Sequence, residues 1–143
     1  MFSDSPQVTE IYFQAQEGAV LGNMQRNRGL KNVLQGLVYF LDDDNIMHPN
    51  FWNILPNITL GHITTFDQLR LEVDPPLRLA GDRLAVNAID TGMFVVDRVM
   101  VGQTQWDPSA GNADGIFVEA VSSQHPNKHV YISEVAAYHH GLL

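Results

Sequence analysis

The fold of this chain is decided by residues 69–106, which read LRLEVDPPLRLAGDRLAVNAIDTGMFVVDRVMVGQTQW. Apolar residues recur in this stretch with a period of two, beginning with Leu69, Leu71 and Val73, and that period is typical of strands. The groups DPP, AGD and DTG separate the apolar runs, and proline, glycine and aspartate favour turns. The stretch therefore predicts an antiparallel meander.

The last run of the meander, Met93–Val101, is apolar on both faces except at Asp97 and Arg98. We expect this run to form a central strand that is buried on both sides. A buried carboxylate is costly unless it is paired, so Asp97 should lie beside an arginine of a neighbouring strand. The candidate arginines are Arg70, Arg78 and Arg83.

Strands are also predicted on both sides of the meander, at Val8–Gln14, Ile116–Val121 and His129–Ala137, where apolar residues are bounded by turn signals. Residues 29–41 are ambiguous. Their apolar positions follow the spacing of a helix face, yet Gly36 disfavours a helix interior and the run LVYFL at 37–41 suits a buried strand equally well. Helix and strand both remain open there.

The number of predicted strands, roughly seven to nine, indicates a mainly β protein. We expect an antiparallel β-sandwich, jelly-roll-like, with at most one short helix. A single domain would span residues 8–143, because the chain has the length of one ordinary domain. Residues 1–7 would form an extended N-terminal arm, since they offer turn residues and little to pack.

The composition excludes several classes of partner. The chain carries a formal net charge of −8 with a pI near 4.9, which opposes binding to nucleic acid and to anionic membranes. Cysteine is absent, so disulfides and thiolate chemistry are excluded. No signal peptide is visible, nor any run of the roughly 18 apolar residues that a membrane helix needs.

The segment Ile46–Thr65 is apolar but irregular, because two prolines and a glycine interrupt it. Large apolar side chains in such a segment must be covered by the domain or by a neighbour. Charged residues make up only 17% of the chain, which is low for a domain whose whole surface faces water. We therefore predict an interface with another subunit, formed by Phe51, Trp52, Ile54 and Leu55.

Hard oxygen ligands of the kind that Ca²⁺ prefers gather in the loop DPSAGNADG, residues 107–115. Asp107 and Asp114 are weak candidate ligands there, because the spacing departs from the helix-loop-helix calcium motif and a surface turn uses the same residues. The run Asp42–Asp44 is interpreted in the same way, as a charged loop. The six histidines form no HxH or HExxH pattern. We expect no metal and no cofactor.

Catalytic motifs are missing from the sequence as well. It contains no GxSxG nucleophile elbow, no cysteine nucleophile and no glycine-rich phosphate loop. The sequence therefore predicts a protein that is not an enzyme.

Residues Gly92–Val101, GMFVVDRVMV, resemble the closing strand of jelly-roll carbohydrate-binding modules, in which a glycine precedes an apolar strand with an aspartate. That resemblance implies a sugar site with an aromatic platform, drawn from Trp52, Trp106, Tyr131 or Tyr138. In overall character the chain is similar to the small β-sandwich virion proteins of bacteriophages, the capsid and decoration proteins. This second resemblance rests on the polar arm, strands rich in Asn, Gln and Thr, the acidic balance and the lack of cysteine.

The second resemblance implies a non-enzymatic virion structural protein that stabilises a capsid by binding across neighbouring subunits. Its partners would be copies of itself, in a symmetric oligomer such as a homotrimer, and a major capsid protein. Two alternatives stay open. One is a carbohydrate-binding jelly-roll module, which would be secreted, and the other is a small metal-dependent enzyme.

Overall fold

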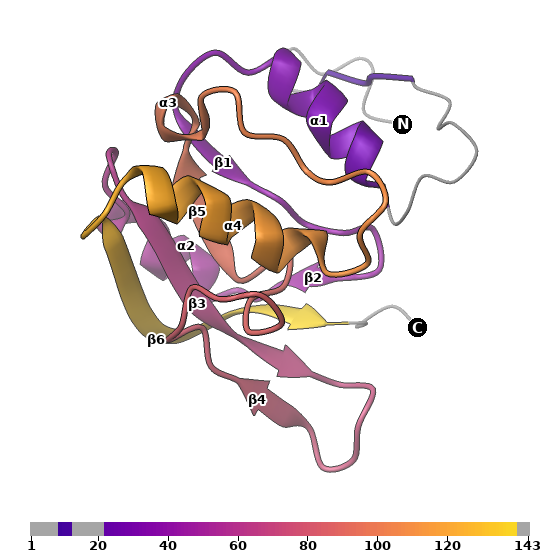
Figure 1. Cartoon of the computed structure of the whole chain (residues 1–143). Coiled ribbons are helices and arrows are strands. Elements are labelled where there is room, and N and C mark those ends of the chain that lie inside the picture. Colours follow the sequence, from indigo (N-terminus) through magenta and orange to yellow (C-terminus); the bar gives the residue numbers. More distant parts are fainter. Residues whose placement is uncertain (1–8, 13–21, 140–143) are drawn as a thin grey trace.

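The computed structural model describes residues 9–12 and 22–139, and the N-terminal arm expected at residues 1–7 lies outside them. The described part of the chain folds into a six-stranded sheet with short helices packed around it (Figure 1). In chain order the elements are α1 (Asn23–Lys31), β1 (Leu37–Tyr39), β2 (Ile46–Met47), α2 (Phe51–Ile54), the 3-10 helix η1 (Leu55–Asn57), β3 (Ile63–Arg70), β4 (Leu77–Leu79), β5 (Phe94–Asp97), α3 (Arg98–Val101), α4 (Ala113–Gln124) and β6 (His129–His139).

The sheet is mixed and has β3 at its centre. The strand order is β1-β5-β3-β6-β2, and β4 pairs with the C-terminal end of β3. Strand β3 is antiparallel to β5 but parallel to β6, with Ile63 opposite both Val96 and His129. The predicted strand-rich fold is therefore confirmed, whereas the prediction of an antiparallel sheet is wrong. The described residues form one sheet, so a sandwich is not confirmed.

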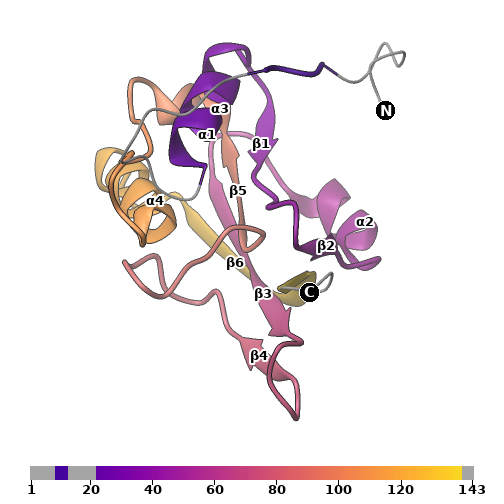
Figure 2. The same ribbon diagram turned by 90° about the vertical axis from the view of Figure 1, so that its right-hand side faces the viewer.

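Helices cover both faces of this sheet. Figure 2 shows α1 and α4 on one side of the strands and α2 on the other. Strand β5 serves both layers because its side chains alternate: Phe94 and Val96 pack under α1 and α4, and Val95 packs under α2. The larger hydrophobic cluster is aromatic, with Trp106 stacked on Phe117 at 4.9 Å between ring centroids.

The run predicted as a long central strand, Met93–Val101, ends early. Strand β5 stops at Asp97, whose carboxylate accepts hydrogen bonds from the backbone N–H of Val99, at 3.1 Å, and of Gly61, at 2.7 Å. Asp97 thus caps α3 and needs no arginine partner. Val95 is buried as predicted, but Val99 lies on α3 with 70% of its surface exposed.

One further prediction of secondary structure is wrong, and an open question is answered. Residues 116–121 lie within α4 and not in a strand, so the chain contains more than the one short helix expected. Residues 29–41 form neither a continuous helix nor a continuous strand, because α1 ends at Lys31 and β1 begins at Leu37. The last predicted strand is confirmed as β6. Among the described residues, no helix has both the length and the apolar character that a membrane span requires.

Candidate functional site

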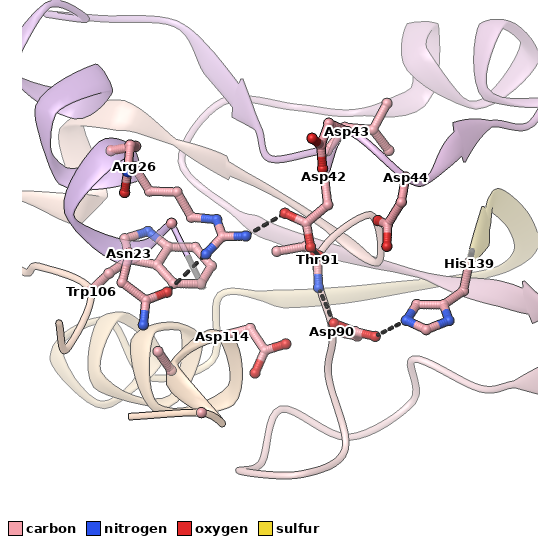
Figure 3. Close-up of a pocket in the computed structure, with 15 residues that line it drawn as sticks. Asn23, Arg26, Asp42, Asp43, Asp44, Asp90, Thr91, Trp106, Asp114 and His139 are labelled. Carbon is pink, nitrogen blue, oxygen red and sulfur yellow. Dashed lines mark hydrogen bonds and ion pairs between the residues drawn. The ribbon is translucent and has the colours of Figure 1, made fainter. Parts of the chain in front are cut away.

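A pocket of about 610 Å³ opens where several elements meet. Helices α1 and α4 begin at this end of the molecule, and strands β3 and β6 finish there, as the contacts of Asn23 with Ala110 and of Asp90 with Arg70 and His139 indicate. Of the described residues that line the pocket, five are aspartates and one is an arginine, and Figure 3 shows them around the opening. We call this region the acidic end; its aspartates are Asp42, Asp43, Asp44, Asp90 and Asp114.

One wall of the pocket consists of polar side chains that bond to one another. Arg26 of α1 makes an ion pair with Asp42 and donates to Asn23 Oδ1 at 2.8 Å. Its guanidinium lies 4.7 Å from the centre of the Trp106 ring, a cation–π contact. Asp42 also accepts a hydrogen bond from the Thr91 hydroxyl at 2.7 Å. These contacts hold α1 against the loop after β1, so this wall is chiefly structural.

A second charge network surrounds Asp90. One oxygen of this carboxylate lies 3.4 Å from Arg70 Nη2 and 3.4 Å from His139 Nε2. The other nitrogen of His139 lies 2.8 Å from a carboxylate oxygen of Glu72. The network joins the end of β3, the end of β6 and the loop before β5, and so fixes the floor of the pocket.

Asp114, in the first turn of α4, faces Asp90 across the pocket (Figure 3). Burial and a hydrogen bond between the two carboxyl groups raise the pKa of Asp114 to about 7. Asp114 therefore keeps its proton up to near neutral pH, chiefly because burial disfavours its charged form. Chemically, the carboxyl group of Asp114 can hold and release a proton near neutral pH, and the surrounding carboxylates favour a positively charged neighbour.

The two weak candidate calcium ligands, Asp107 and Asp114, make different contacts. The carboxylate of Asp107 accepts hydrogen bonds from the backbone N–H of Ser109, at 2.9 Å, and from its hydroxyl, at 2.8 Å. These bonds lower the pKa of Asp107, which does not line the pocket that Asp114 faces. Within residues 9–12 and 22–139, no group of three or more histidine, aspartate or glutamate side chains could hold a metal ion.

The four predicted interface residues fall into two groups. Phe51 and Ile54 are buried in the chain's own core, 4% and 3% exposed, where they pack with Phe66 and Val95. The prediction that these two contact another subunit is therefore corrected. Leu55 is half-buried, and Trp52 has 65% of its surface exposed. One helical turn explains the difference, because residues 51 and 54 share a face and residue 52 points away from it.

The aromatic platform expected for a sugar site does not assemble. Trp106 is buried beneath Arg26 on the α1 and α4 face of the sheet, whereas Trp52 lies on α2 at the opposite face. The hydroxyl of Tyr131 donates to Asp67, and the ring of Tyr138 packs on His48. Only Trp52 of the two tryptophans can offer a ring to a ligand.

Sequence reasoning singled out Asp42–Asp44 and Asp114 separately but missed the pocket that joins them. It assigned no role to Arg26, Asp90 or His139, since these residues are distant in sequence and meet only through the sheet topology. Neither a family model nor a curated protein sequence matches this chain.

Proposed function

We propose that this protein is a non-enzymatic structural protein of a virion, which stabilises a capsid by binding across neighbouring subunits of a major capsid protein. The observation that supports this proposal is the exposure of Trp52 on a helix whose other side is anchored in the core. The acidic composition, the lack of cysteine and the absence of a catalytic motif agree with a structural role.

The anchoring of α2 makes Trp52 suitable for docking. Phe51 stacks on Tyr39 at 4.7 Å between ring centroids, and Ile54 lies in the same hydrophobic cluster. The helix is therefore held rigidly, and little conformational entropy is lost when its outer face is covered. Tryptophan is the residue most enriched among those that dominate protein–protein binding energy.

A second candidate function is carbohydrate binding, because an exposed tryptophan ring can also stack on a sugar. The rest of an aromatic platform is lacking around Trp52 in the described residues, so we rank this function below the first.

The proposal is tested by co-sedimentation of the recombinant chain with virus particles that are built from the major capsid protein and lack this chain. Trp52→Ala should weaken binding to particles at least about tenfold. The matched control is Leu77→Ala, which removes an exposed apolar side chain from β4. Equal binding by Trp52→Ala and the wild type would contradict the proposal, and retardation of the wild type on a glycan matrix without binding to particles would favour the second function.

A further inference from the structure

The end of the molecule opposite the acidic end exposes three large apolar side chains. Leu34 is 86% exposed, Val99 is 70% exposed and Leu60 is 61% exposed. They belong to the segments that precede β1, follow β5 and precede β3, and these three strands are neighbours in the sheet. Exposed apolar groups gathered at one place mark interaction sites more often than single ones do.

Hydrogen bonds hold these three segments together. The Asp97 carboxylate binds the backbone N–H of Gly61, next to Leu60, and that of Val99 itself. The neighbouring Arg98 donates from Nε to the carbonyl of Val33, at 2.8 Å, and from its backbone N–H to the carbonyl of Gly36. The surface is thus fixed in shape.

Three cationic residues belong to segments that adjoin this apolar surface. Lys31 lies in the last turn of α1, and Arg98 donates to the carbonyl of its neighbour Leu30. The carbonyl of Lys128 accepts from the N–H of Ile63, the first residue of β3. Lys31 and Lys128 are exposed, whereas Asp97 is buried and occupied by backbone donors. We call this region the basic end. It contrasts with a chain whose net charge is −8.

The two ends are far enough apart to act independently. Helix α4 has 12 residues, which span about 18 Å. It carries Asp114 in its first turn at the acidic end, and the ring of its C-cap residue, His125, lies 2.9 Å from the carbonyl oxygen of Met100 in α3. This separation exceeds the Debye length of about 8 Å at physiological salt. A second copy can therefore be attracted at each end without cancellation by the opposite end of the same molecule.

We propose that the basic end of one molecule docks on the acidic end of a second copy, so that the chain associates head to tail. The inference rests on the proposed structural function and names a partner for it. Opposite charge selects the acidic end over another basic end, and Leu34, Leu60 and Val99 supply the apolar area. A head-to-tail contact that closes after three copies gives the homotrimer expected from the sequence, and one that does not close gives a filament.

Complementary end-blocked variants test this proposal in solution. The first variant, Lys31→Glu with Leu34→Ser and Val99→Ser, has a disabled basic end, and the second, Asp43→Lys, has a weakened acidic end; all four residues are exposed. The wild type should form oligomers larger than a dimer in sedimentation velocity runs. Each variant alone should associate at least about tenfold more weakly, and their equimolar mixture should give a dimer that contains one of each. Leu77→Ser is the matched control and should behave as the wild type.

Two results would overturn the head-to-tail contact. If the Asp43→Lys variant formed dimers by itself as tightly as the wild type associates, the basic ends would face each other through their apolar residues. If the wild type stayed monomeric at every concentration but bound particles through Trp52, the head-to-tail contact would be wrong while the proposed function would stand. A monomer that also fails to bind particles would defeat both, so the two failures are distinguishable.

Discussion

Asp114 is the side chain whose titration should affect folding near neutral pH. Its pKa is raised from the ordinary 3.8 to about 7, first by burial and then by the hydrogen bond with Asp90. The folded state therefore holds this proton more tightly than the unfolded state does. The resulting contribution to the free energy of unfolding is complete below the unfolded pKa and is lost as the pH rises from about 4 to about 7.

Replacing Asp114 with asparagine should remove this pH dependence. The amide stays neutral and keeps an N–H donor for Asp90, so Asp114→Asn should be more stable than the wild type above pH 7 by roughly 1–2 kcal/mol, a value reduced because the group is partly solvated. Denaturant unfolding of both proteins across this pH range checks the difference. Asp43→Asn, at an exposed carboxylate, serves as the control. Parallel profiles for the wild type and Asp114→Asn would contradict the raised pKa of Asp114.

Gly81 is required by a close approach of two backbones. A Cβ atom at this position would lie 2.1 Å from the carbonyl oxygen of Phe66, and neither backbone can move away easily. Gly81→Ala should therefore cost at least about 3 kcal/mol of unfolding free energy. Gly29 in α1 has open space around it, so Gly29→Ala should stabilise the chain by about 0.5–1 kcal/mol. Thermal unfolding of the two variants gives the comparison, and a stable Gly81→Ala protein would refute the packing of this loop on β3.

At the level of elements, the turns could be predicted from local sequence. Whether some apolar runs form a helix or a strand could not. The DPP turn does separate β3 from β4, and the final strand was found. Residues 116–121 were mistaken for a strand because a short apolar run suits both structures. Tertiary packing decides for the helix: Phe117, Val118 and Val121 fall on one helical face in the core, and Gly115 lies against the backbone of Val86.

Helix α1 illustrates the same limit, since polar contacts position it. The side-chain amide of Asn23 donates to the carbonyls of Asp107 and Ala110, and Asn27 bonds both the N–H and the carbonyl of Trp106. These partners are more than 75 residues away in the chain. Apolar periodicity therefore placed the candidate helix too late, at residues 29–41.

Strand β5 stops at Asp97, before the predicted end of the strand at Val101, and this difference can be tested. Val95 lies in the strand and is 2% exposed, whereas Val99 lies on α3 at the surface. Val95→Asp should bury an unpaired charge and prevent folding, at a cost of several kcal/mol. Val99→Asp should change the unfolding free energy by no more than about 0.5 kcal/mol. Circular dichroism with thermal melts separates the two, and an unfolded Val99→Asp protein would restore the long buried strand.

On the scale of the whole molecule, acidic side chains gather at one end and basic side chains at the other. This separation follows from the topology and could not be predicted from the sequence. The composition gave the acidic balance, but the local sequence offered no indication that Asp42, Asp90 and Asp114 share one end while Lys31 and Lys128 share the other. Both α1 and α4 start at the acidic end and finish at the basic end. The dipole of α1 favours Lys31 in its last turn and that of α4 favours Asp114 in its first turn, since cations are stabilised near helix C-termini and carboxylates near N-termini.

The two tryptophans allow particle attachment and self-association to be measured separately. Trp106 is 1% exposed and Trp52 is 65% exposed, so acrylamide should quench mainly the fluorescence of Trp52 in the free chain. The proposed head-to-tail association uses the two ends of the molecule, and Trp52 is not among the residues assigned to either, so quenching should stay unchanged as the oligomer forms. Binding to particles should protect Trp52 and shift its emission to shorter wavelength, because the ring loses contact with water. The variant Trp52→Phe, which retains only Trp106, supplies the baseline. Protection of Trp52 by self-association alone would mean that copies of the chain meet through α2, and the assignment of separate surfaces to the two contacts would be wrong.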